Sequence, residues 1–363
     1  MEGGDATGDR SGRRFGTGAV LVLAGVILLV GVITLVLWPT GTGRPGGSLG
    51  PGEAPPRPAS VPIADDEVLM GVYVENLQVV IPETNSFTGD VYVWYRWSNP
   101  NLRPNETVEF MNLYEAWQLV TWSALEEPTE QPDGTRYYVA RHQGAFNSAL
   151  QLRNYPFGTQ YLRFVLEDFE SEVGAFRFIT GPDSLGIDPE ISLPGYHILA
   201  PSLEITEFAY GTNFGDLDST ADERYSRATV TIPIRHPVVT NVIKYLVPII
   251  LVVIASALIF QVPPNMVEAR IGLSITALLT LVAMQWSSMD GLPLMSYLTL
   301  LDALYLVSLV FILGSLIAGL RVSWLARDRG EAAAIKVDER SMVIYLIGFG
   351  LAFGATLAAF LLT

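Results

Sequence analysis

Residues 267–293, VEARIGLSITALLTLVAMQWSSMDGLP, contain the clearest structural signal in the sequence. Its apolar part, Arg270 to Met289, contains the roughly 20 residues that a helix needs to cross a bilayer. Small, hydroxyl and bulky side chains recur there at every third or fourth position, which predicts a distinct face on an α-helix. That face comprises Gly272, Thr276, Leu279, Ala283, Trp286 and Asp290, with Glu268 just before it. Two interpretations fit it: a surface for close helix packing, or the wall of a water-filled pore.

Composition narrows the class of protein. The chain has 363 residues, of which half are hydrophobic, and its mean hydropathy of +0.34 indicates several membrane spans. With no cysteine, disulfides, thiolate metal sites and cysteine nucleophiles are excluded. The three scattered histidines and the lack of HExxH, GxSxG or phosphate-binding glycine motifs predict no enzyme, no metal site and no cofactor.

The net charge of −15 comes mostly from the acidic excess between residues 61 and 240. An acidic surface repels nucleic acid, so we expect no nucleic-acid partner. The same surface would enrich cations near a membrane, or would simply aid solubility.

The N-terminal 60 residues divide into three parts. Residues 1–18 are polar and contain three arginines, and residues 19–38 are an uncharged apolar run. The arginines predict that residues 1–18 are a cytoplasmic tail. This run is longer than a signal-peptide core and no A-x-A-like cleavage site follows it, which predicts a transmembrane signal anchor; a cleaved signal is the alternative. Residues 39–60 are a linker rich in glycine and proline.

Residues 61–238 are expected to form an all-β sandwich. Short β-rich runs, several of them alternating, are separated by turn residues, as such a fold requires. The runs are 73–81, 91–97, 135–143, 160–167 and 228–234. A weak helical pattern occurs around 106–119.

Residues 239–363 are expected to form a four-helix transmembrane domain. The apolar segments are Tyr245–Phe260, Arg270–Met289, Tyr297–Leu320 and Met342–Leu362. Five basic residues lie between the third and fourth segments, so this connection should be cytoplasmic. The expected location is therefore the plasma (inner) membrane, with several spans and the β domain outside or periplasmic.

Several motifs carry a resemblance to a known family. YPFGTQ at Tyr155–Gln160 is similar to an aromatic-Pro-Phe-Asp-x-Gln loop, Pro248 to a first-helix proline, and Arg235 to an arginine that ends the sandwich. EARIGLSITALLTL, from Glu268 onward, is similar to a pore helix. With the order of domains, these motifs resemble the pentameric ligand-gated ion channel family, the Cys-loop receptors and their bacterial relatives, from about Leu69 to the C-terminus.

The departures from the family pattern are specific. Gly158 replaces the aspartate of the loop motif. Asn99, in Trp97-Ser98-Asn99, replaces the aspartate of a Trp-x-Asp motif on the second strand. Ser148 and Leu162 stand where the family has its disulfide. Only about 20 residues connect the third and fourth helices, where animal receptors have a large insert. The resemblance is therefore to a bacterial-type, cysteine-free member.

The resemblance implies a homopentamer in a lipid bilayer, opened by a small-molecule or ion ligand. The implied pore residues are Glu268, Gly272, Thr276, Leu279 and Ala283. Five copies of Glu268 would favour permeant cations, with Leu279 as the gate. Arg270 would oppose cations if it faced the lumen. We expect cation selectivity.

The family binds ligands at subunit interfaces through aromatic side chains. Sequence offsets place Tyr92, Phe169 and Tyr225 at ligand-binding positions, although each could instead be a packed strand aromatic. Asp168 could pair with a ligand cation or be a solvated loop carboxylate.

Coupling between ligand and gate is implied for the loop at Pro156 and Phe157, against the outer turn 291–296 and with Arg235 nearby. Asp302 is a further coupling candidate as an intramembrane carboxylate; a local hydrogen bond that fixes the outer turn is the alternative. The expected function is a ligand-gated, cation-selective channel of unidentified agonist. The alternative is a membrane-anchored β-sandwich receptor or sensor that does not conduct ions.

Overall fold

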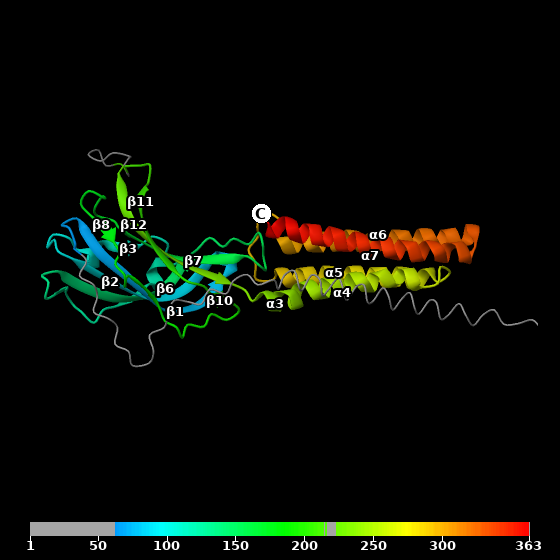
Figure 1. The fold of residues 1–363 in the computed structure, drawn as a ribbon, viewed down its shortest axis with the longest axis horizontal. Helices are drawn as coiled ribbons and strands as arrows, with labels where there is room; N and C mark the ends of the chain where they lie inside the picture. The colour runs from blue at the N-terminus through cyan, green and yellow to red at the C-terminus, as the bar shows by residue number, and fades with distance from the viewer. Residues whose placement is uncertain (1–61, 214, 216–222, 363) are drawn as a thin grey trace, which may run out of the picture. The chain divides into compact units, whose positions relative to one another are not determined.

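The computed structural model describes residues 62–213, 215 and 223–362. The expected tail, signal anchor and linker at 1–18, 19–38 and 39–60 lie outside the described residues. The described chain divides into two compact units (Figure 1). One contains the strands up to Arg235, and the other contains the helices from His236 together with the loop Leu152–Gly158.

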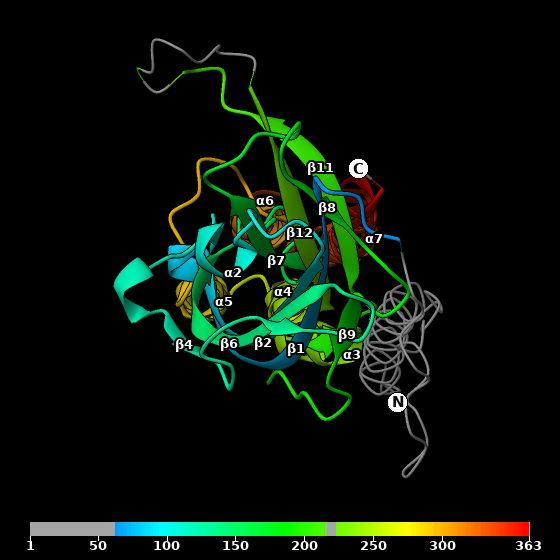
Figure 2. The ribbon, with the colours of Figure 1, turned by 90° about the vertical axis from the view of Figure 1, so that its left-hand side faces the viewer.

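The strand unit is a sandwich of two sheets (Figure 2). The seven-stranded sheet contains β1 (Glu67–Ile81), β2 (Ser86–Trp97), β4 (Val120–Trp122), β5 (Thr129–Glu130), β6 (Arg136–Asn147), β8 (Arg177–Ile179) and β9 (Leu185–Ile187). The five-stranded sheet contains β3 (Val108–Phe110), β7 (Thr159–Asp168), β10 (His197–Ile198), β11 (Ser202–Ala209) and β12 (Arg224–Arg235). Alternate residues of β2 are buried, such as Val91, Val93 and Tyr95, because successive side chains of a strand point to opposite faces. The expected all-β sandwich is confirmed.

The strands extend beyond the β-rich runs seen in the sequence. β1 begins at Glu67 rather than residue 73, and β12 begins at Arg224 rather than residue 228. Both extensions are held by neighbours distant in sequence: Glu67 is in register with Arg177, and Arg224 with Ala209. Strand ends form through this tertiary pairing, which local propensity does not reveal.

The weak expectation of a helix around 106–119 is wrong. One helical turn, α2 (Pro104–Thr107), is followed by β3, and a single 3₁₀ turn, η2 (Ala116–Gln118), comes later. The amide nitrogen of Met111 donates to the Val165 carbonyl at 2.8 Å. The Asn112 side chain donates to the Arg163 carbonyl and accepts from the Val165 amide. The amide of Tyr114 likewise donates to Ala145, so backbone groups that a helix would need are bonded to strands instead.

From His236 onward, the described residues contain four helices long and apolar enough to cross a membrane, as expected (Figure 1). The first runs over Val238–Gln261 as α3 (Val238–Asn241), the π-helical η3 (Val242–Leu246), α4 (Val247–Ala257) and the 3₁₀ turn η4 (Leu258–Gln261). The π turn lies just before Pro248, which has no amide hydrogen to continue the α-helical pattern. The other helices are α5 (Val267–Met289), α6 (Leu300–Arg329) and α7 (Glu331–Leu361).

The connection of about 20 residues expected between the third and fourth helices is itself helical. α6 ends at Arg329 and α7 begins at Glu331, so Gly330 alone lies between them. Its φ of 88° falls in the left-handed region that glycine adopts without steric cost. The flanking residues are rich in alanine, arginine, glutamate and lysine, all strong helix formers. These polar residues therefore extend the two helices and do not form a separate connection.

Candidate functional site

The face of α5 singled out in the sequence is exposed in the single chain. Glu268, Gly272, Thr276, Leu279 and Ala283 are all exposed. The opposite side of α5 packs inward through Arg270, Ser274, Ala277 and Leu281. The Thr276 hydroxyl donates to the Gly272 carbonyl at 2.8 Å, which satisfies the hydroxyl group within the helix. α5 thus presents an acidic end, a small and hydroxyl-bearing middle and an apolar band along one uncovered face.

Arg270 points away from this face. Its side chain is fully buried and forms an ion pair with Asp338 of α7, whose side chain is 4% exposed. The guanidinium group also donates to the carbonyls of Val262 and Gly319. Sequence reasoning left the direction of Arg270 open and did not identify Asp338, because 68 residues separate the two.

The loop Leu152–Gly158 is seated on the helices of its own unit. The Asn241 side-chain amide donates to the Pro156 carbonyl at 2.5 Å, and the hydroxyls of Tyr155 and Tyr245 are 3.0 Å apart. Phe157 packs against the apolar core of the helices. This loop therefore contacts the start of the first membrane helix.

The same loop also reaches α6. The Leu300 amide donates to the Arg153 carbonyl at 2.8 Å, directly after the outer turn that the sequence singled out. A displacement of the loop would act on both helix ends.

Asp302 has the local role that was its alternative interpretation. Its carboxylate accepts from the Thr299 amide at 3.0 Å and from the Thr299 hydroxyl at 2.8 Å, and that hydroxyl accepts from the Asp302 amide. This capping box starts α6. The second carboxylate oxygen, Oδ1, is buried without a hydrogen-bond partner among the described residues, so a coupling role stays a prediction.

Tyr92 lines a surface cavity of about 520 Å³ on the seven-stranded sheet. Arg141, on the adjacent β6, lies 5.4 Å from the Tyr92 ring centroid and 6.0 Å from that of Trp122. Asp90 holds the guanidinium through two hydrogen bonds of 2.8 and 2.6 Å. These bonds raise the pKa of Arg141 above its ordinary value. The cavity thus offers a permanent cation between aromatic rings.

Phe169 is 59% exposed, which fits a residue available for contact. Its neighbour Asp168 is only 1% exposed. The Asp168 carboxylate accepts from the Thr107 hydroxyl at 2.8 Å and from the backbone amides of Glu170 and Ser171. Burial raises its pKa despite these bonds. Both interpretations of Asp168, a ligand partner or a solvated carboxylate, are therefore wrong: it organises the loop behind Phe169.

Tyr225 belongs to a polar and aromatic cluster that sequence reasoning missed. Glu167 accepts from Arg227 at 2.7 Å and from the Tyr210 hydroxyl at 2.5 Å. The Arg227 guanidinium lies 3.4 Å from the Phe208 ring centroid, and the Tyr210 and Tyr225 rings are 5.8 Å apart. Burial, and then the bond to Glu167, raises the pKa of Tyr210 to about 12. Glu167 directly precedes the candidates Asp168 and Phe169, but its partners are Arg227 of β12 and Tyr210, which follows β11.

Tyr92 and Tyr225 do not meet within one chain. Val91 and Val93 are buried inside the sandwich, so Tyr92 faces outward from the seven-stranded sheet. Ala228 and Val230 are buried likewise, so odd-numbered residues such as Tyr225 face outward from the other sheet. Arg235 ends β12 and is in register with His197 and Thr159.

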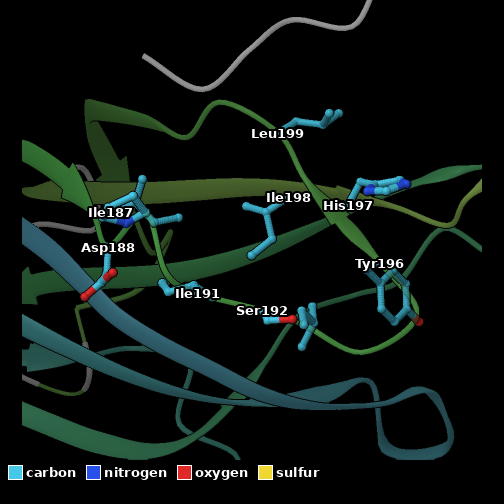
Figure 3. A pocket seen from close by; sticks show the side chains of 10 residues that line it. Ile187, Asp188, Ile191, Ser192, Tyr196, His197, Ile198 and Leu199 are labelled. Carbon is cyan, nitrogen blue, oxygen red and sulfur yellow. The ribbon is translucent and has the colours of Figure 1, made fainter. Parts of the chain in front are cut away.

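A second cavity, of about 290 Å³, lies under the segment from β9 to β10 (Figure 3). Ile187, Ile191 and Ile198 supply apolar lining, with Asp188 and His197 at its polar parts. The Asp188 carboxylate accepts from the Glu190 amide at 2.7 Å, so it serves a local turn. This cavity carries none of the residues singled out in the sequence.

A comparison with known protein families finds a match in the helical unit. Residues 245–344 match the family model described as the neurotransmitter-gated ion-channel transmembrane region. This stretch covers most of the first membrane helix, all of α5 and α6, and the start of α7.

Curated relatives extend the similarity into the β unit. The chain is 25% identical over 214 residues to pH-sensitive chloride channel 2 of Drosophila melanogaster, covering 57% of this chain and 40% of the relative. It is 22% identical over 291 residues to gamma-aminobutyric acid receptor subunit beta of Caenorhabditis elegans, covering 72% and 50%. It is 25% identical over 211 residues to gamma-aminobutyric acid receptor subunit beta-4 of Gallus gallus, covering 58% and 41%. The matches thus cover half or less of each of these relatives.

The family match in the helices and the similarity of the longer chain to these relatives indicate the same kind of protein. This similarity supports the pentameric ligand-gated ion channel family as the family of this chain.

Proposed function

We propose that copies of this chain assemble around a common axis into a ligand-gated ion channel lined by α5. One observation carries the proposal: a helix of membrane length leaves Glu268, Thr276 and Leu279 exposed on one face. A carboxylate turned toward lipid is unfavourable, so that face is expected to meet water. A central pore shared by several copies supplies this water, and a ring of Leu279 closes it by dewetting.

The β unit lies outside the membrane, as in the family, and receives the ligand. Tyr92 and Tyr225 face outward from different sheets, so a site that uses both requires two neighbouring copies. This arrangement supports ligand binding at subunit interfaces in a homopentamer. The ligand would favour one of two packings of sandwich against helices, with the loop around Pro156 as a connecting element.

Two relatives are named for gamma-aminobutyric acid, which carries an amine and a carboxylate. The chain offers complementary groups: Arg141 beside Tyr92 on one outer face for the carboxylate, and the Tyr210 and Tyr225 rings on the other for the amine. Gamma-aminobutyric acid is therefore the first agonist to test. Acidic pH is the second, because another relative is named as pH-sensitive.

We propose that the channel selects cations. Glu268 is exposed at the start of α5, whereas Arg270 is buried and paired with Asp338. Five carboxylates at the mouth then act without opposition from five guanidinium groups. Chloride selectivity is the second candidate, favoured by the name of the Drosophila relative.

Recording from the purified full chain in planar bilayers tests both parts. Under a sodium chloride gradient, the reversal potential should lie near that of sodium and move toward that of chloride in Glu268→Gln. Glu331→Gln, an exposed carboxylate at the start of α7, should leave it unchanged. A wild-type reversal potential at that of chloride would establish the second candidate. A chain that never conducts, with either agonist, would instead favour the anchored β-sandwich receptor.

A further inference from the structure

The Arg270 guanidinium is enclosed by three other segments of the helical unit. Its Nε and Nη2 atoms donate to the Val262 carbonyl, between η4 and α5, at 3.1 and 2.5 Å. Its Nη1 atom donates to the Gly319 carbonyl of α6 at 3.0 Å and to Asp338 Oδ1 of α7 at 3.3 Å. Nη2 and Oδ2 make a second, shorter contact. Among the described helices, one side chain thus connects α5 to the residue that ends the first membrane helix, to α6 and to α7.

The arrangement separates two opposite charges that are adjacent in sequence. Glu268 and Arg270 are two residues apart, which corresponds to about 200° around an α-helix. Glu268 is exposed, whereas the Arg270 side chain is completely buried. The negative charge therefore lies on the proposed pore face and the positive charge lies behind the helix.

We propose that Asp338 is a positioning residue for ion selectivity. Its carboxylate holds Arg270 behind α5, so that Glu268 alone sets the charge at the inner mouth of the pore. This inference rests on the proposed function, and it assigns a role in selectivity to a helix outside the pore.

Removing the carboxylate would release the arginine. Val262 and Gly319 offer only neutral carbonyl oxygens, and a buried charge without a charged partner is strongly destabilised. The site also has little spare room, since a Cβ on Gly319 would lie 2.5 Å from Ile259. Arginine has a long flexible stem that can carry its charged end to water. Water lies on the far side of α5, where the freed charge would oppose Glu268.

Chemical access to Arg270 tests the holding role without any need for conduction. Phenylglyoxal modifies accessible guanidinium groups, and mass spectrometry of the solubilised full chain measures its reaction at Arg270. In Asp338→Asn the reaction should be at least about tenfold faster, because the loss of the partner of a buried charge exceeds a factor of ten in equilibrium. Glu339→Gln, an exposed neighbour on α7, should match the wild type. Equal rates in Asp338→Asn and wild type would overturn the inference even if the proposed function holds.

Selectivity is the second readout. Asp338→Asn should raise the chloride-to-sodium permeability ratio by roughly tenfold, since five released cations lie close to the ion path. Asp338→Glu should keep the wild-type ratio. Arg270→Gln/Asp338→Asn should restore it, which a merely structural role for Asp338 would not predict. A conducting Asp338→Asn channel with an unchanged ratio would overturn the inference.

Mixed assemblies cover the case in which Asp338→Asn fails to assemble alone. Coexpression with wild-type chains places fewer substituted copies in each channel, and the ratio should then rise with their number. An unchanged ratio in mixed channels of verified composition would overturn the inference. A wild-type chain that never conducts would refute the proposed function, while the phenylglyoxal rates would still decide whether Asp338 holds Arg270.

Discussion

Replacing Leu279 by alanine should make the channel open more readily. The Leu279 side chain is 63% exposed in the single chain, on the face proposed to line the pore. The substitution removes three carbons, each worth about 0.8 kcal/mol when kept from water. Scaled by the exposed fraction of 63%, the closed state loses about 1.5 kcal/mol per subunit. That corresponds to about a tenfold shift in the closed-to-open equilibrium for each subunit that contributes.

Single-channel recording without agonist measures this shift as open probability. Leu351→Ala on α7 is the matched control, because it makes the same chemical change at a site 70% exposed but away from the proposed pore. We expect Leu279→Ala to open spontaneously and Leu351→Ala to behave as the wild type. If Leu279→Ala assembles and conducts but its open probability does not rise, Leu279 is not the gate.

Asn241→Ala removes the hydrogen bond to the Pro156 carbonyl, which is worth about 1 kcal/mol. Agonist concentration–response curves should then shift to higher concentration, while the affinity for the ligand is unchanged. A matching fall in affinity would contradict a coupling role. Burial lowers the pKa of His142 to about 4 from 6.5. The unfolded chain therefore binds a proton more readily, and the free energy of unfolding should fall by up to about 3 kcal/mol between pH 6.5 and 4. Thermal unfolding of the full chain measures this, and His142→Phe should flatten the profile; an equally steep profile would be the contrary result. Gly319→Ala should lower the free energy of unfolding by about 1–3 kcal/mol through overpacking, and with it the melting temperature. Gly314→Ala has open space around its Cβ position and should not lower the melting temperature.

The faces of α5 could be predicted from sequence because residues at helical spacing differ sharply in size and polarity. Glu268, Thr276 and Leu279 carry that pattern without any knowledge of their neighbours. The sandwich was also predictable from alternation, as in β2. Its strand ends were not, because Arg224 joins β12 through a partner in β11.

The charged partnerships lay beyond sequence reasoning. Arg270 could face the lumen or the helix backs, and only the position of Asp338 on α7 decides between them. Glu167 looks like an ordinary strand carboxylate until Arg227 and Tyr210 close over it. In both cases the deciding contact joins residues more than 40 positions apart. Helical periodicity gives no information about such contacts.

The single residue between α6 and α7 limits what can be spliced into this chain. Gly330 is exposed and lies where one helix turns directly into the next. A passenger domain inserted there must therefore enter and leave at almost the same point. A fluorescent protein with adjoining termini could be carried on this hairpin, whereas a rod-like insert would force the two helices apart.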